Sequence, residues 1–187
     1  MKRNFVGSGI MKGYYKKPAE TAEVFTSDGF FRTGDAGKFD EKGNLYITDR
    51  IKDLMKTSNG KYITPQPIEN LLSNNHLINQ AMIIAEGKPF VTALIVPNFE
   101  SLQDQIAKMN IPFTNWKELV NSDKIKELYR EKLEEIQKSL SGFEKVKKFI
   151  LMPAEFEIGN GEITPTLKVK RNVVLKKYEA LIDQMYS

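Results

Sequence analysis

The chain has 187 residues, of which 41% are hydrophobic, and a net charge of +4 from 28 basic and 24 acidic residues. That size and hydrophobic content exclude a disordered chain, and the small excess of mixed charge is unlike a nucleic-acid-binding domain. The lack of cysteine excludes disulfides and thiolate catalysis, and a single histidine, His76, disfavours structural zinc or a Ser–His triad.

The first fifty residues are rich in glycine and aromatic residues and have few segments that could form strands. Pro18 suits the first turn of a short helix. The segments 37–39 and 45–48 flank the turn 40–44 and predict a hairpin. So few strands would not build an independent core, so we expect this segment to pack against something else.

From residue 51 onward the pattern is that of a compact domain in which strands and helices mix without a βαβ rhythm, which favours an α+β fold. Asn59-Gly60 predicts the turn of a second hairpin. A helix is expected after Pro65 and Pro67, and two buried strands at 81–85 and 90–97.

The remainder of the chain is predicted to be mainly helical, with helices at about 99–109 and 115–140, a strand at 146–153 and a final helix spanning 173–185. Within the long helix, apolar residues fall at spacings of three and four. These spacings place them on one stripe that packs into a core: Ile125, Leu128, Tyr129, Leu133, Ile136 and Leu140.

The first candidate site is the segment Phe31-Arg32-Thr33-Gly34-Asp35. A carboxylate directly after a glycine, on a turn leading into a strand, can accept hydrogen bonds from two neighbouring hydroxyls, and a ribose supplies such a pair. Asp35 could therefore bind a nucleotide sugar. Equally, its side chain could simply close its own turn.

A second candidate lies at the boundary, in Asp49-Arg50-Ile51-Lys52-Asp53. Arg50 could bind ribose or phosphate, and Lys52 could be a hinge whose backbone angles change between two states. Four charged residues in five at a boundary also describe a solvated linker.

The third candidate is the glycine-punctuated segment 159–171, which carries Lys168 and Lys170 just before a helix. An ammonium group held there could stabilise negative charge that develops during acyl or phosphoryl transfer. The alternative is an exposed basic helix N-terminus, although cations at that end oppose the helix dipole.

Together these segments closely resemble the adenylate-forming superfamily of acyl-CoA synthetases. The resemblance rests on FFRTGDAGKFDEKGNLYITDRIKDLMKTSNGKYITPQPIE and, about a hundred residues later, NGEITPTLKVKRNVV. The preceding GIMKGYYKKPAETAEVF is similar to the segment that leads into them. The long-chain fatty acid–CoA ligases within this superfamily have segments that resemble KTSNGKYITPQPIE and TPTLKVKR.

The resemblance implies an acid–thiol ligase that joins a fatty acid to ATP, releases pyrophosphate, and then transfers the acyl group to CoA with release of AMP. Asp35 and Thr33 would contact the nucleotide, with Arg50 supporting its sugar or phosphate. Lys52 would be the hinge before the C-terminal lid.

Two further residues receive roles from the resemblance. Gly60 would lie beside the pantetheine arm of CoA, where a missing side chain leaves room. Lys168 would be the lysine of the adenylation step, with Lys170 as a nearby rival. Glu69 is interpreted as part of a helix start, and no metal ligand is expected within this chain.

The family's phosphate-binding loop, acyl pocket and magnesium-binding glutamate belong to a region that this sequence lacks. We therefore expect 1–51 to be a β-rich remnant of the large domain and 52–187 to be the lid, inactive alone and prone to self-association. Such a parent protein would be cytoplasmic or peripheral at a membrane. The alternatives are a ligase for an aryl or medium-chain acid, and a non-catalytic module that binds a nucleotide or a partner.

Overall fold

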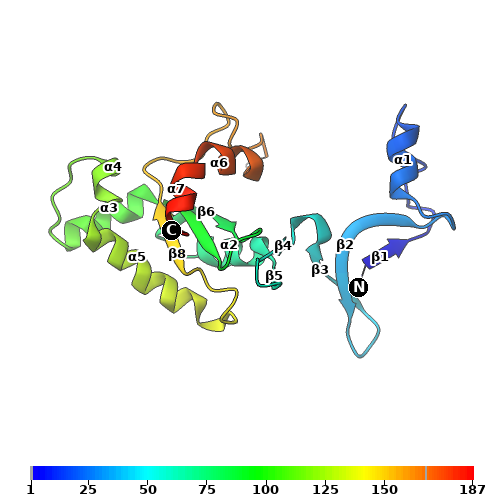
Figure 1. Cartoon of the computed structure of the whole chain (residues 1–187), viewed down its shortest axis with the longest axis horizontal. Helices are drawn as coiled ribbons and strands as arrows, with labels where there is room; N and C mark the ends of the chain where they lie inside the picture. Colours follow the sequence, from blue (N-terminus) through cyan, green and yellow to red (C-terminus); the bar gives the residue numbers. More distant parts are fainter. Residues whose placement is uncertain (1, 167) are drawn as a thin grey trace. The chain divides into compact units, whose positions relative to one another are not determined.

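A computed structural model describes residues 2–166 and 168–187 and shows an α+β chain (Figure 1), as predicted. It divides into two compact units, one ending at Leu54 and one beginning at Met55. We refer to them as unit 1 and unit 2.

Unit 1 is built on a three-stranded antiparallel sheet with the order β1-β2-β3. Its strands are β1 (Lys2–Phe5), β2 (Phe31–Phe39) and β3 (Leu45–Arg50), with helix α1 at Pro18–Val24 and a 3₁₀ turn, η1, at Ile51–Asp53. The short helix and the β2–β3 hairpin confirm the prediction, but both strands are longer than expected and β1 was not foreseen.

The hairpin turn between β2 and β3 is held by Asp40. Its Oδ1 accepts hydrogen bonds from the backbone N–H groups of Lys42 (2.9 Å) and Asn44 (2.8 Å). These bonds hold the carboxylate in its ionised form, and the bonds from Asn44 lead in lowering the pKa of Asp40. The turn is therefore an Asx-type turn, as the sequence around Asp40 predicted.

Unit 1 has no hydrophobic side chain that is fully buried, among those whose burial the structure describes. Among the residues of unit 1 whose burial is described, only Gly37, in β2, is buried. With no buried apolar group among its described side chains, a sheet of this size has little to stabilise it.

Unit 2 contains a mixed sheet with the order β6-β7-β8, in which β6 and β7 are antiparallel and β7 and β8 are parallel. The strands are β6 (Ile78–Ile84), β7 (Thr92–Pro97) and β8 (Lys148–Leu151). A separate two-stranded hairpin, β4 (Met55–Lys56) and β5 (Tyr62–Ile63), precedes them. The helices of unit 2 are α2 (Pro65–Ser73), α3 (Phe99–Lys108), α4 (Trp116–Leu119), α5 (Asp123–Ile136), η2 (Gln137–Ser139), α6 (Arg171–Lys177) and α7 (Glu179–Gln184).

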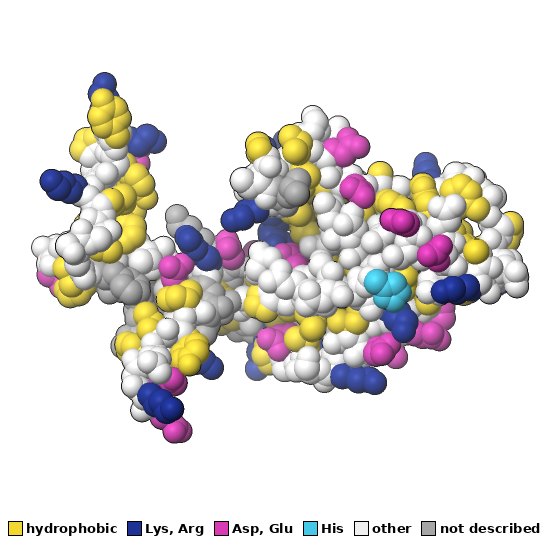
Figure 2. All heavy atoms as spheres, turned by 180° about the vertical axis from the view of Figure 1, so that it is seen from behind, with side chains coloured by type: hydrophobic (Ala, Val, Ile, Leu, Met, Phe, Trp, Pro, Cys, Tyr) yellow, Lys and Arg dark blue, Asp and Glu magenta, His cyan; other side chains and the backbone are white. Residues whose placement is uncertain are grey.

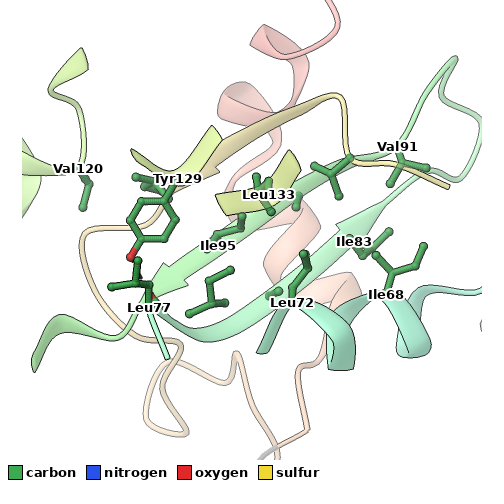
Figure 3. Close-up of a cluster of buried hydrophobic side chains, with 14 of the residues drawn as sticks. Ile68, Leu72, Leu77, Ile83, Val91, Ile95, Val120, Tyr129 and Leu133 are labelled. Carbon is green, nitrogen blue, oxygen red and sulfur yellow. Dashed lines mark hydrogen bonds between the residues drawn. The ribbon is translucent and has the colours of Figure 1, made fainter. Parts of the chain in front are cut away.

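Side chains of the unit 2 sheet point alternately to its two faces, and each face belongs to its own hydrophobic core. The first, which we call the α5-side core, joins the sheet to α2 and α5 (Figure 3). Its members include Ile68, Leu72, Ile83, Ala93, Ile95, Ile125, Tyr129 and Leu133. The second, the α7-side core, joins the opposite face to α6 and α7. Its members include Met82, Ile84, Leu94, Val96, Ile163, Val174, Ile182 and Met185.

The predicted apolar stripe of the long helix lies where expected. Ile125, Tyr129 and Leu133 are buried in the α5-side core, and Leu128, Ile136 and Leu140 are partly buried against it. The Tyr129 hydroxyl donates to the Leu77 carbonyl at 2.7 Å, and burial raises the pKa of this phenol.

Two predicted helices are wrong in extent. The helix over 115–140 is divided into α4 and α5 because Ser122 caps a new helix, its Oγ accepting from the Ile125 N–H at 3.4 Å. The final helix is divided into α6 and α7 at Tyr178, whose φ of −109° and ψ of 19° leave the helical region.

Figure 2 shows one face of the molecule, on which acidic and basic side chains are interspersed and the histidine is at the surface. Among the helices described, none is both long and apolar enough to cross a membrane.

Candidate functional site

The unit 1 candidates Thr33, Asp35 and Arg50 lie together on adjacent strands. Asp35 and Arg50 are partners in the β2–β3 register. The Arg50 Nε donates to Asp35 Oδ1 at 2.9 Å, and the Thr33 Oγ1 accepts from the Asp35 N–H at 3.1 Å. Arg50 therefore orients the 20% exposed Asp35 side chain, while Thr33 holds the Asp35 backbone; the Arg50 side chain itself is 67% exposed.

The backbone between Thr33 and Asp35 is shaped by Gly34, whose φ of +77° is a conformation that L side chains rarely adopt. A Cβ at this position would meet nothing within 4 Å. The glycine is therefore needed for its backbone conformation, and the space beside it is open. An ionised carboxylate offers about four acceptor positions, so the ion pair with Arg50 leaves Asp35 able to accept from a diol.

The proposed hinge residue, Lys52, lies in η1, directly after the extended β3. The backbone becomes extended again at Leu54, with φ of −65° and ψ of 127°. A single 3₁₀ turn between two extended stretches is a short element whose angles can change without breaking a long helix. The Lys52 side chain lies outside what the structure describes.

Gly60 lies in the tight turn between β4 and β5, as the sequence predicted. Its φ is +78°, its N–H donates to the Thr57 carbonyl at 2.9 Å, and an added Cβ would meet nothing within 4 Å. The turn thus has an open surface at Gly60, which a bulky approaching group could use.

The β4–β5 hairpin is fixed to the turn between β6 and β7. The Ser58 N–H donates to the Lys88 carbonyl at 3.0 Å, and the Gly87 N–H donates to the Lys56 carbonyl at 2.8 Å. The Lys56 N–H also donates to the Glu86 carboxylate at 2.7 Å. These bonds make the small hairpin part of the unit 2 scaffold.

Lys168 lies in a short hairpin, hairpin 162–170, of which residues 162–166 and 168–170 are described. The Thr164 N–H donates to the Lys168 carbonyl at 2.8 Å, and the Lys168 N–H donates back to Thr164 Oγ1 at 3.0 Å. Ile163 and Val169 form an isolated antiparallel bridge next to this pair. These bonds hold the backbone of Lys168. Its side chain is exposed, so the ammonium group can reach outward.

An ion pair between α2 and α6 was not recognised in the sequence. Glu69 accepts from the Ile83 N–H (2.8 Å) and from Arg171 (2.7 Å), and Arg171 also donates to the Ile83 carbonyl at 2.6 Å. The interpretation of Glu69 as a helix start is therefore wrong: its carboxylate connects α2, β6 and α6. Arg171 stands three residues after Lys168, so this network also fixes one end of the Lys168 segment.

A buried carboxylate, Glu162, was also missed. Its side chain accepts from Lys177 (2.9 Å), from the Tyr178 hydroxyl (2.9 Å) and from the Glu157 N–H (3.1 Å). Burial alone would raise the pKa of Glu162, but these donors outweigh it and lower the pKa. The pKa of Lys177 is raised by its bond to Glu162, and burial raises that of Tyr178. The available signal was a charged residue between a glycine and the strand-like Ile163-Thr164.

The candidates thus form two groups: Thr33, Asp35, Arg50 and Lys52 in unit 1, and Gly60 and Lys168 on separate segments of unit 2. In the described part of the chain, no three His, Cys, Asp or Glu side chains are grouped so that they could hold a metal ion.

Comparison with known proteins identifies the domain. Residues 52–187 match the family described as AMP-binding enzyme C-terminal domain. The long-chain-fatty-acid–CoA ligase 5 of Mus musculus is 37% identical over 183 residues, covering 96% of this chain and 27% of the relative. The long-chain-fatty-acid–CoA ligase FadD15 of Mycobacterium tuberculosis is 34% identical, covering 97% of this chain and 30% of the relative.

A solved structure agrees with these matches. The A domain of a carboxylic acid reductase from Segniliparus rugosus, in complex with AMP and a co-purified carboxylic acid, superposes with a TM-score of 0.79 at 26% identity. The superposition covers 98% of this chain and 27% of that one. The chain spans between a quarter and a third of the length of the relatives it matches. It belongs to the family of AMP-binding enzyme C-terminal domains.

Proposed function

We propose that this chain is the C-terminal part of a long-chain fatty acid–CoA ligase, and that it acts only together with a large nucleotide-binding domain. The observation that carries the proposal is the 37% identity to such a ligase across 96% of the chain. Since that match covers 27% of the relative, the rest of the ligase, including its nucleotide-binding domain, would come from sequence outside this chain.

In the first step, a carboxylate oxygen of the fatty acid attacks the α-phosphorus of ATP, and pyrophosphate leaves with the bonding electrons. Asp35 would accept hydrogen bonds from the ribose hydroxyls, with Arg50 fixing its carboxylate and Thr33 holding its backbone. Lys168 would place its ammonium between the α-phosphate and the attacking carboxylate. Its role is electrostatic and orienting, because it neither gives nor takes a proton.

In the second step, the CoA thiolate attacks the acyl carbonyl and AMP leaves. The open side of Gly60 would let the pantetheine arm pass, and Lys52 would be the hinge that exchanges the two poses of unit 2. Magnesium would be held by residues outside this chain. Cytoplasmic location, soluble or peripheral at a membrane, remains a prediction.

The first test is fatty-acid- and CoA-dependent AMP release, measured for this chain and for a longer protein in which it follows its large domain. We expect release by the longer protein only. Release by the 187 residues alone would contradict the proposal. If the longer protein prefers aryl or medium-chain acids, long-chain fatty acids are not its substrate class.

The second test concerns Lys168. In the longer protein, Lys168→Ala should lower fatty-acid-dependent ATP–pyrophosphate exchange by about 10²–10³-fold, because it removes one group that stabilises developing charge. Lys170→Ala is the comparison, since Lys170 is exposed in the same hairpin. Unchanged exchange in Lys168→Ala, with a loss in Lys170→Ala, would reassign the role to Lys170.

A further inference from the structure

The buried carboxylate of Glu162 is placed at the base of the hairpin that carries Lys168. Only 1% of Glu162 is exposed, although burying a charge is costly unless it is paired. Lys177 and Tyr178 both donate to its Oε1 at 2.9 Å, and the Glu157 N–H donates to its Oε2 at 3.1 Å. The carboxylate is therefore held from two directions, by the 157–161 turn and by the α6–α7 junction.

The backbone of the same residue forms the neck of the hairpin. The Glu162 carbonyl accepts from the Lys170 N–H at 2.7 Å, and the Glu162 N–H donates to the Glu157 carbonyl at 3.1 Å. The Ile163–Val169 bridge and the Thr164–Lys168 bonds follow in order toward the tip. A rotation of Glu162 would thus be transmitted through these paired residues to Lys168.

Toward its tip, the hairpin is held by a bond between the Thr164 and Thr166 hydroxyls at 3.0 Å and by Val169, which packs against the α7-side core. Pro165, Thr166 and Lys168 are exposed, whereas Glu162 and Ile163 are buried. Ile163 packs in the α7-side core, which fixes its position, but an apolar contact has no preferred direction. The hydrogen bonds of Glu162 do have directions, so they can also fix the orientation of the hairpin.

We propose that Glu162 is a positioning residue that sets the orientation of hairpin 162–170 and thereby delivers the Lys168 ammonium to the adenylation step. This inference rests on the proposed role of Lys168. A lysine side chain is long and flexible, so only a fixed backbone can restrict where its ammonium acts. A displacement of about 1 Å at a reacting centre can cost about 10²-fold in rate.

Variants of Glu162 and Lys177 separate the orientation of the hairpin from the burial of the Glu162 side chain. Glu162→Gln keeps the size of the side chain but loses the charge, and its amide cannot accept from all three donors. Glu162→Leu keeps a buried, apolar anchor and loses every directed bond. Lys177→Met removes the cation that pairs with Glu162. Lys176→Met is its matched control, because Lys176 is exposed on the same helix and has no ion pair in the described chain.

The first experiment uses the 187-residue chain and does not depend on activity. Amide hydrogen exchange should be faster by about 10-fold or more at residues 163–170 in Glu162→Gln, Glu162→Leu and Lys177→Met, with β6 and β7 still protected. Lys176→Met should match the unchanged chain. Full protection of the hairpin in Glu162→Leu would overturn the proposal, because burial alone would then suffice.

The second experiment uses the longer protein and separates the two half-reactions. Glu162→Gln should lower kcat for ATP–pyrophosphate exchange by about 10–100-fold with the KM for ATP within about threefold, and should leave thioester formation from supplied acyl-adenylate unchanged. An equal loss in both half-reactions would mean a purely structural role and would overturn the inference.

Lys168→Ala distinguishes this inference from the proposed function. If Lys168→Ala abolishes exchange and Glu162→Gln leaves it intact, only the positioning role is wrong. If Lys168→Ala has no effect, the role of Lys168 and this inference both fail. In the double variant Glu162→Gln with Lys168→Ala, exchange should be no lower than in Lys168→Ala alone, because both changes act on the same function, the placement of the Lys168 ammonium.

Discussion

The two carboxylates that organise unit 2, Glu69 and Glu162, each connect segments that are distant in sequence. Glu69 pairs with Arg171, 102 residues away, and Glu162 with Lys177, 15 residues away. In both cases the cation belongs to α6. Breaking a pair by removing one partner leaves a charge without compensation, which is more costly than the pair itself is stabilising.

The Glu162 network predicts a specific dependence of stability on pH. The lowered pKa of Glu162 stabilises the folded state above the ordinary value of 4.5, and this contribution is lost as the pH falls through the folded pKa. The raised pKa of Lys177 stabilises below 10.5, and this contribution is lost as the pH rises through its folded value. Stability from the pair is therefore greatest between these limits.

Urea unfolding of the unchanged chain and of Glu162→Gln, measured from pH 3 to pH 11, tests this linkage. The difference in free energy of unfolding between them should be largest near neutral pH and should shrink in acid. A difference that does not vary with pH would show that Glu162 is not ionised in the folded state.

At the scale of residues, sequence reasoning could place candidate residues whose surroundings are local. Gly60 lies in a turn whose neighbours dictate its form, and Asp35 lies in β2, where the β2–β3 register brings Arg50 to it. Glu162 and Glu69 could not be found in this way, because nothing near them in the sequence identifies Lys177 or Arg171 as the partner. Tertiary packing alone brings these groups together.

Elements show the same division between local and non-local causes. The tight hairpins and the stripe of α5 follow from turn residues and periodicity, and were predicted. The interruption before α5, where Ser122 caps a new helix, was not predicted. The separation of α6 from α7 at Tyr178 accompanies the hydroxyl's bond to Glu162, 16 residues earlier.

The cap of α5 can be tested directly. Ser122→Ala should lower the free energy of unfolding by about 1 kcal/mol, since the Ile125 N–H loses its acceptor. Ser73→Ala is the control: Ser73 is the exposed last residue of α2, and its substitution should change stability by less than about 0.5 kcal/mol. Equal effects in chemical denaturation would show that the 3.4 Å contact of Ser122 contributes nothing.

The whole chain combines one unit that has two hydrophobic cores with one whose described side chains include no buried hydrophobic residue. We expect the amides of β2 and β3 to exchange with deuterium at least about 100-fold faster than those of β6 and β7, because opening unit 1 exposes little apolar surface. Mild proteolysis should therefore cut before residue 55 and leave unit 2 intact. Comparable protection of both sheets would contradict this expectation.

Self-association is the second prediction at this scale. Tyr46 and Ile47 in β3 are 52% and 54% exposed, and Phe39 in β2 is 53% exposed. Tyr46 and Ile47 point to opposite faces of this small sheet, and exposed apolar side chains there favour contact between copies, so light scattering should show the apparent mass rising with concentration. Ile47→Lys should reduce that rise, whereas a monomer at high concentration without any substitution would refute the prediction.

The α7-side core has a consequence for how the domain is made. Met82, Ile84, Leu94 and Val96 are synthesised long before α6 and α7, which follow every strand and supply Val174, Ile182 and Met185 to cover them. On the ribosome, the sheet therefore emerges with one hydrophobic face exposed until the last two helices leave the exit tunnel. During that interval the nascent chain is a natural client for chaperones, and a stop codon before Arg171 would make the exposure permanent.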